Sequence, residues 1–156
     1  NIDHNKIEDN DKIRSNNIGI VYQEKNLLPD FTALENVCLA SLAINNNHKI
    51  AEQESLKIIQ KVGLKDRINH FPSELSGGEL QRIAISRAIV NKPRIILADE
   101  PTGSLDHENA NQIFNLLFKL KNKDRVIIFA THNRFFANKA DCLLEMKNGS
   151  IKTTNA

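Results

Sequence analysis

The chain has 156 residues, of which 40% are hydrophobic and 26% are charged, the proportions of a soluble globular domain. Its formal net charge of +2 is too small for the basic footprint of a nucleic-acid-binding domain, so we expect no nucleic-acid partner. No apolar run approaches the ~18 residues of a membrane-spanning helix, and no signal-peptide pattern opens the chain. Two cysteines do not make a disulfide framework. We therefore expect one cytoplasmic domain, or one large piece of a bigger domain.

The first part of the chain predicts one strand followed by helices. The β-branched run over 18–22 predicts a buried strand, and the polar residue Gln23 ends it. A T-x-x-E capping box predicts a helix over 32–44. Apolar residues at helical spacing predict an amphipathic helix over 50–62, which Gly63 ends.

A second capping box, S-x-x-E, begins at Ser76 and predicts another helix. The stretch from about 33 to 92 is therefore expected to be wholly helical. Beyond it, apolar runs over 94–98 and 126–130 predict two more buried strands, with a helix over 106–121 between them.

The C-terminal part predicts a β-hairpin, with strands over 142–146 and 150–153 around the turn Asn148-Gly149. The alternation of continuous apolar strands with helices predicts an α/β fold whose parallel sheet is covered on both faces. The helical stretch between the first two strands is too long for a simple crossover, so we expect it to form a subdomain.

Polar residues end each of the three predicted strands: Gln23, Asp99 with Glu100, and His132. Ligands of open parallel sheets bind outside the carboxyl ends of the strands, so these side chains are expected to converge. One carboxylate can hold Mg²⁺ and a second can polarise an attacking water. A Gln can orient that water or touch the metal, and a His can contact a transferring phosphoryl group. Gln23 and His132 are each also typical of ordinary loop positions, so the Asp-Glu pair is the most informative.

The turn Ser76-Gly77-Gly78 predicts an anion site. Two glycines at a helix start let backbone N–H groups approach a phosphate closely, and the helix dipole favours the anion. The Ser76 hydroxyl adds a donor. On the turn alone, a flexible helix entry capped by Ser76 is an equally open interpretation.

Five segments in order resemble the motifs of ABC-type ATPases. Residues 75–82, Leu-Ser-Gly-Gly-Glu-Leu-Gln-Arg, resemble the signature motif. The run 95–100 resembles the Walker B element, and 101–106 resembles the D-loop. Tyr22-Gln23 resembles the Q-loop, and His132 resembles the switch histidine. The resemblance covers essentially the whole chain.

A narrower resemblance points to the lipoprotein-releasing ATPases of Gram-negative bacteria. It rests on the segments 21–23, 27–37, 72–75, 97–103, 144–146 and 148–149. Macrolide-export and cell-division ATPases share much of this pattern, so an ATPase of a related exporter stays open as an alternative. A non-transport member of the superfamily is disfavoured, since the distance from Gln23 to Ser76 leaves no room for a coiled-coil arm.

The resemblance implies an architecture and a partner set. The fold is expected to be a P-loop-type parallel sheet core, about 15–32 and 93–156, with an inserted α-helical subdomain at about 33–92, all within one partial ABC ATPase domain. It also implies ATP and Mg²⁺ as cofactors, a second copy in a head-to-tail dimer, and integral-membrane transporter subunits. The loop Glu24 to Phe31 and the helices would form the groove for those subunits, on the cytoplasmic face of the inner membrane.

The resemblance also implies residue roles. Asp99 and Gln23 are expected to bind Mg²⁺, Glu100 to polarise the water and His132 to sense the γ-phosphate, with Gln23 also linking the site to the membrane subunits. The residues expected to contact the nucleotide are Ser76, Gly77, Gly78, Glu79 and Asp106.

One motif of the family is absent. The sequence contains no G-x-x-x-x-G-K-[ST] phosphate loop and begins with Asn. We therefore expect a C-terminal part of a longer chain, which by itself does not hydrolyse ATP. The alternative is a truncated or split, non-catalytic gene product.

Overall fold

The structure is a computed structural model and describes residues 7–154. Its elements in chain order are α1 (Ile7–Asn17), β1 (Ile18–Val21), α2 (Ala33–Leu42), α3 (His48–Lys61), the 3₁₀ helices η1 (Lys65–Arg67) and η2 (Pro72–Glu74), α4 (Gly77–Ile89), β2 (Ile95–Asp99), α5 (His107–Leu120), β3 (Val126–Ala130), α6 (Arg134–Ala137), β4 (Leu143–Lys147) and β5 (Ser150–Thr154).

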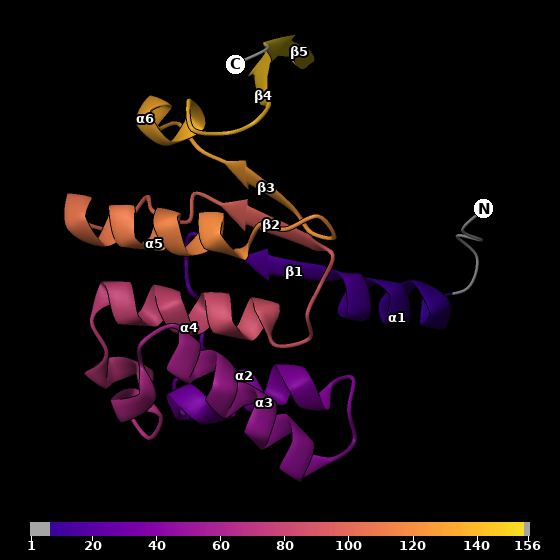
Figure 1. The fold of residues 1–156 in the computed structure, drawn as a ribbon, viewed down its shortest axis with the longest axis vertical. Helices are drawn as coiled ribbons and strands as arrows, with labels where there is room; N and C mark the ends of the chain where they lie inside the picture. The colour runs from indigo at the N-terminus through magenta and orange to yellow at the C-terminus, as the bar shows by residue number, and fades with distance from the viewer. Residues whose placement is uncertain (1–6, 155–156) are drawn as a thin grey trace.

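Three parallel strands form the central sheet in the order β1-β2-β3. Ile18 pairs with Ile95, and Ile95 pairs in turn with Val126, so the carboxyl ends of all three strands lie at one edge of the sheet. Figure 1 shows the three arrowheads pointing the same way, with α4 and α5 beside the strands. The predicted parallel α/β sheet is confirmed.

The expectation that both faces of the sheet are covered is wrong for β3. Val126 and Ile128 leave 59% and 53% of their surface exposed, although Ile127 and Phe129 pack against the core. Successive side chains of a strand point to opposite faces. Among the described residues, nothing packs on the face that carries Val126 and Ile128, so half of this apolar strand stays in contact with solvent.

The predicted capping boxes define the helix starts. Thr32 caps α2, with Glu35 donating its backbone N–H to Thr32 Oγ1 and accepting from the Thr32 backbone N at 2.7 Å. Ser76 caps α4 in the same way. The helix α3 ends at Lys61 with Val62 as C-cap, and Gly63 follows with a φ of +78°, the left-handed conformation of a C′ residue.

The helix α4 joins two apolar clusters. Its Ile85 and Ile89 pack with β1, β2 and α5, whereas its Ile83 belongs to a second cluster formed with α2 and α3. The region 33–92 thus has apolar packing of its own but shares α4 with the sheet. The division into subdomains at 33–92 stays a prediction.

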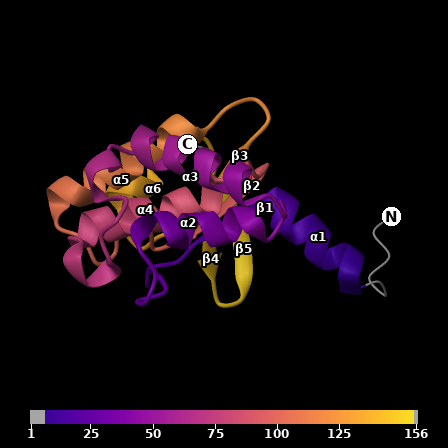
Figure 2. The same ribbon diagram turned by 90° about the horizontal axis from the view of Figure 1, so that it is seen from below.

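The C-terminal hairpin lies outside the central sheet. β4 and β5 pair antiparallel in a separate two-stranded sheet, and Figures 1 and 2 show it projecting from the body of the molecule. Asn148 and Gly149 both have positive φ, at +51° and +74°, as a two-residue type I′ turn requires. The predicted hairpin is therefore confirmed.

Two helices were not expected from the sequence. The helix α1 is rich in Asn and Asp and has no apolar stripe, so hydrophobic periodicity gives no signal for it. Figures 1 and 2 show it extending away from the rest of the molecule. The single turn α6 is too short for a periodic signal, and its start depends on Asn133 as N-cap.

Candidate functional site

The strand ends bring together the polar residues that the sequence placed there. Val21 pairs with Ala98, and Asp99 pairs with Ala130. Gln23, Glu100 and His132 follow these positions by one or two residues, so they lie along one edge of the sheet, as expected for its ligand-binding side.

Glu100 occupies a strained backbone position directly after β2. Its φ of +40° lies in the left-handed region that non-glycine residues rarely adopt. Two backbone hydrogen bonds of 3.0 Å hold it there, from Glu100 N to the carbonyl of Ala130 and from Gly103 N to the carbonyl of Glu100. This conformation turns the Glu100 side chain toward the loop after β3.

The loop after β3 holds both oxygens of the Glu100 carboxylate. The backbone N of His132 donates to Oε1 at 2.7 Å, and Thr131 Oγ1 donates to Oε2 at 3.2 Å. His132 Nδ1 also lies 2.7 Å from Oε1. Only 18% of the Glu100 side chain is exposed, against 83% of the His132 side chain. A largely buried carboxylate, held by hydrogen bonds, thus lies beside a solvent-facing imidazole.

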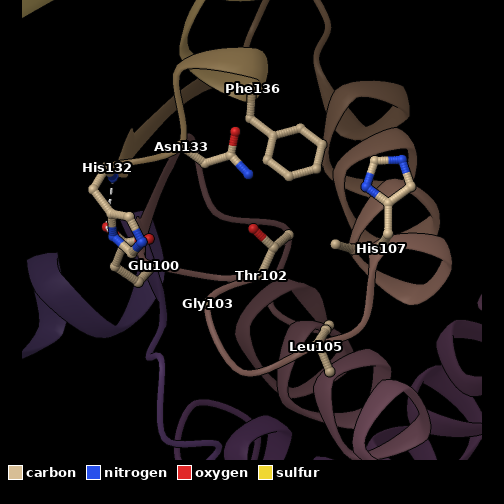
Figure 3. A pocket seen from close by; sticks show the side chains of 9 residues that line it. Glu100, Thr102, Gly103, Leu105, His107, His132, Asn133 and Phe136 are labelled. Atoms are coloured by element: carbon tan, nitrogen blue, oxygen red, sulfur yellow. Dashed lines mark hydrogen bonds and ion pairs between the residues drawn. The ribbon is translucent and has the colours of Figure 1, made fainter.

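A cavity of about 250 Å³ opens beside this pair. Figure 3 shows Glu100 and His132 on one side of it and His107, from the start of α5, on the other. The complete lining consists of Glu100, Thr102, Gly103, Leu105, His107, Ala110, His132, Asn133 and Phe136. The Glu100 carboxylate therefore faces a space that small polar molecules can enter.

The Gln23 side chain lies against the loop after β2. A Cβ built on Gly103 would lie 3.3 Å from Gln23 Nε2 and 3.4 Å from Glu100 Cβ. Gly103 therefore lets the Gln23 amide approach the loop that carries Glu100. A larger residue at position 103 would push Gln23 away from this loop.

The oxygen atoms at this edge of the sheet fit a magnesium ion that takes only one or two ligands from the protein and most of its ligands from substrate phosphates and water. Asp99 is exposed at the end of β2, and the Gln23 carbonyl offers a second oxygen. Among residues 7–154 there is no cluster of three or more His, Cys, Asp or Glu able to hold a metal. Mg²⁺ is commonly held by one or two protein oxygens, with water and substrate phosphates completing its octahedron.

The signature turn lies at the start of α4. Ser76 Oγ accepts from the Glu79 backbone N at 3.3 Å, and Glu79 Oε2 accepts from the Ser76 backbone N at 2.8 Å. Glu79 is therefore engaged in capping. Ser76 and Gly77 are exposed whereas Gly78 is buried, so the backbone of the turn faces solvent on one side.

Gly78 is required by packing against α5. A Cβ at Gly78 would lie 2.3 Å from Asn109 Oδ1 and 2.8 Å from Asn109 Cγ, whereas a Cβ at Gly77 would meet only Leu105 Cδ2, at 3.5 Å. The two glycines thus differ: Gly78 makes room for a neighbouring helix, and Gly77 borders open space.

Asp106 holds the Asn109 side chain that packs against Gly78. It caps α5 by accepting from the Asn109 backbone N at 3.0 Å, and Asn109 Nδ2 donates to its other oxygen at 2.6 Å. These hydrogen bonds hold the pKa of the Asp106 carboxyl below its ordinary value. Asp106 therefore fixes Asn109 against Gly78 and connects the loop after β2 to the signature turn.

Sequence reasoning missed the residues that hold the loop after β1. The Arg87 guanidinium donates to the carbonyls of Asn26, at 2.5 Å, and Lys25, at 2.8 Å. Burial lowers the pKa of Arg87. The buried Asn36 side chain accepts from Leu28 N and donates to three carbonyls, including that of Phe31. No local sequence signal marks these long-range contacts.

Another missed contact starts inside a recognised motif. Gln81, only 1% exposed, donates from Nε2 to the Tyr22 carbonyl at 3.4 Å. Its burial on α4 could have been suspected from its place among apolar residues, but its partner could not.

Comparisons with known proteins agree with this arrangement. A sequence profile of the family described as "ABC transporter" matches residues 1–103. The solved dimeric structure of a post-hydrolysis state of the ATP-binding cassette MJ0796 bound to ADP and Pi superposes with a TM-score of 0.84 at 33% identity, over 96% of this chain and 67% of that chain. Fold and strand-end site define an α/β nucleotide-binding cassette.

The chain belongs to the ABC transporter family. It is 44% identical to the lipoprotein-releasing system ATP-binding protein LolD of Rickettsia bellii over 96% of this chain, and 47% identical to that of Rickettsia typhi over 89%. It is 45% identical to the LolD protein of Xanthomonas oryzae pv. oryzae over 90% of this chain. The chain spans 68%, 63% and 58% of these three relatives.

Within residues 7–154, no helix combines the length and the apolar character that a bilayer-crossing segment needs.

Proposed function

We propose that the protein is an ATP-hydrolysing subunit of an ABC transporter that powers release of lipoproteins from the inner membrane. The observation that carries the hydrolytic part is the Glu100 carboxylate, held by the backbone N of His132 and facing a cavity of about 250 Å³ at the carboxyl ends of the strands. The lipoprotein part is supported by relatives at 44–47% identity that bear that name.

In this proposal Glu100 is the group that polarises the attacking water. Its carboxylate is held by hydrogen bonds from the loop after β3 and lines the cavity, so it can accept a proton from a water bound there. His132, exposed beside it, contacts the γ-phosphate, and its partner Glu100 orients the imidazole. Gln23 reports the occupancy of the site to the loop that follows it.

Magnesium would be held by Asp99 and the Gln23 side chain, with phosphate oxygens and water as the other ligands. When bound, the ion neutralises charge that develops on the phosphoryl group. Asp99 ends β2 and is exposed, whereas Glu100 follows it in a left-handed conformation with its carboxylate held by the loop after β3. One carboxylate can therefore face the metal while the other faces the water.

The dimer is supported by the exposed signature turn. Gly77 is exposed at the first position of α4, where the backbone N–H groups of a helix favour an anion, and the exposed Ser76 adds a hydroxyl donor. In a head-to-tail pair, this turn would receive the phosphate of ATP held by the other copy. Glu79 and Asp106 would serve this contact by fixing the turn and by joining it to the loop after β2.

The groove for membrane subunits is supported by the loop over 24–31. Side chains of Arg87 and Asn36 donate hydrogen bonds to its backbone carbonyls. Leu28 and Phe31 expose 45% and 38% of their surface. A rigid loop with exposed apolar side chains suits a protein partner, here the integral-membrane subunits at the cytoplasmic face of the inner membrane.

A substitution at Gly77 tests whether ATP drives dimer formation through this turn. In the natural polypeptide that carries these residues, Gly77→Asp places a carboxylate where the phosphate must approach, while the surrounding space tolerates a Cβ. ATP binding to each subunit should persist, but ATP-driven dimer formation, measured by size-exclusion chromatography with light scattering, should fail. Gly77→Ala is the matched control. ATP-dependent dimers of Gly77→Asp would contradict the proposal.

Lipoprotein release is tested in the cell of origin. Depletion of the protein should leave outer-membrane lipoproteins in the inner-membrane fraction, and the wild-type gene should restore their sorting. Correct sorting during depletion, with increased macrolide sensitivity or a division defect instead, would assign the ATPase to a related exporter.

A second candidate concerns these 156 residues by themselves. They contain no G-x-x-x-x-G-K-[ST] segment, and most phosphate contacts of such ATPases come from that loop. We therefore expect the 156-residue chain alone to bind ATP weakly and to hydrolyse none. Micromolar ATP affinity by calorimetry would contradict this expectation.

A further inference from the structure

The carboxylate of Glu79 lies where a negative charge opposes the binding of an anion. It occupies the third position of α4, and its Oε2 accepts from the Ser76 backbone N at 2.8 Å. The same turn is the one proposed above to receive a phosphate. A carboxylate so close to a phosphate site repels the ligand, and the repulsion grows where protein replaces water.

The charge on Glu79 persists at neutral pH. The hydrogen bond from the Ser76 backbone N, with further help from Arg67, holds the pKa of Glu79 below its ordinary value of 4.5. Only 18% of its side chain is exposed, but Ser76 and Gly77 beside it face solvent, where salt can still screen its interaction with an incoming anion.

Arg67 supplies the opposing charge from outside α4. Its Nε donates to Glu79 Oε1 at 3.1 Å, from the 3₁₀ helix η1 that precedes the signature segment. Among residues 7–154 this is the only ion pair of either side chain. Arg82, one turn further along α4, donates instead to Gln112 at 3.0 Å.

We propose that Arg67 is a positioning residue for ATP-dependent pairing of two copies, because it neutralises the Glu79 carboxylate and so lets Glu79 cap the signature turn without repelling the incoming phosphate. The inference rests on the proposed function of this turn. Glu79 has two separable properties. Its oxygen accepts a hydrogen bond that the turn needs, and its negative charge repels the phosphate.

Charge compensation gives the test. In the natural polypeptide, Arg67→Gln should raise the ATP concentration for half-maximal dimer formation by about tenfold. The double variant Arg67→Gln/Glu79→Gln should return to within about twofold of Glu79→Gln alone, since the glutamine oxygen still accepts from Ser76 N while the charge is gone. Arg67→Lys, which keeps the charge, should stay near wild type.

Salt separates electrostatics from folding. At about 1 M salt the Debye length falls to roughly 3 Å, so the Arg67→Gln defect should shrink, whereas a structural defect should persist. If Arg67→Gln also lowers the unfolding temperature, the ATP concentration for half-maximal dimer formation is compared between wild type, Arg67→Lys and the double variant instead.

Three results would overturn the inference. They are wild-type dimer formation by Arg67→Gln, a defect that Glu79→Gln does not rescue, and a defect that salt leaves unchanged. A wild-type protein that forms no dimer with ATP would instead contradict the proposed function itself, and this inference with it.

Discussion

Glu100 and His132 are joined twice, because one carboxylate oxygen, Oε1, lies 2.7 Å from both the backbone N and the ring Nδ1 of His132. The backbone contact depends on the path of the chain after β3 and not on the identity of residue 132. The ring contact depends on histidine. The two parts of this relationship are therefore separable by mutation.

Replacing His132 with alanine removes the ring and keeps the backbone N–H that holds Glu100. Since 83% of the side chain is exposed, we expect the unfolding temperature to change little, by the equivalent of about 0.5 kcal/mol or less. Turnover should fall about 100-fold if the imidazole contacts the γ-phosphate in the transition state. Single-turnover hydrolysis of radiolabelled ATP measures this, and a rate within threefold of wild type would remove His132 from the chemistry.

Gly78→Ala should destabilise the fold, whereas Gly77→Ala should not. The new Cβ would lie 2.8 Å from Asn109 Cγ, so Asn109 must swing away and lose its 2.6 Å hydrogen bond to Asp106. We expect a cost of about 1–2 kcal/mol, measured as a lower midpoint of urea unfolding.

A double variant locates the cause of that cost. Asn109→Ala removes the obstructing side chain, so Gly78→Ala should cost markedly less in the Asn109→Ala background than in wild type. Equal costs in both backgrounds would show that Gly78 serves something other than the contact with α5.

The exposed face of β3 predicts self-association of the 156-residue chain. Within residues 7–154, the strand that carries Val126 and Ile128 pairs with β2 on one side only, and exposed apolar edge strands promote aggregation. Val126→Thr/Ile128→Thr should raise the soluble monomer fraction in sedimentation velocity. Ile50→Thr, at an exposed helix position, is the control, and an equal gain from it would contradict a specific role of β3.

Much of the fold could be predicted because its signals are local. The capping boxes at Thr32 and Ser76 and the apolar run of β3 each lie within a few residues, and the structure has these elements where the patterns put them. The position of Glu100 beside His132 followed from parallel strands ending at one edge. The left-handed backbone of Glu100 could not be predicted, because a glutamate does not favour this conformation.

The remaining features depend on contacts between distant parts of the chain. Arg87 holds a loop 61 residues away, and Gly78 is small because of Asn109 on another helix. The solvent-facing side of β3 was missed for a related reason. A continuous apolar run is typical of a strand buried on both faces, but the run carries no information about which element covers each face.

Glu100→Gln tests whether this carboxylate activates the water for ATP hydrolysis. The change keeps the side chain's size and its ability to accept from the His132 backbone N, so the site should keep its geometry and bind Mg-ATP normally. A glutamine cannot take a proton, and general-base help is worth ~10²–10⁴ in rate. Asp99→Asn, at the neighbouring position, should instead weaken the Mg²⁺ dependence and ATP binding together.

The measurement is steady-state ATP hydrolysis by the natural polypeptide that carries these residues, with size-exclusion elution recorded with and without ATP. The account predicts that Glu100→Gln hydrolyses ATP at least ~100-fold more slowly than wild type and accumulates a dimer only when ATP is present. Near-normal turnover by Glu100→Gln would contradict it and would transfer the role of the base to another residue.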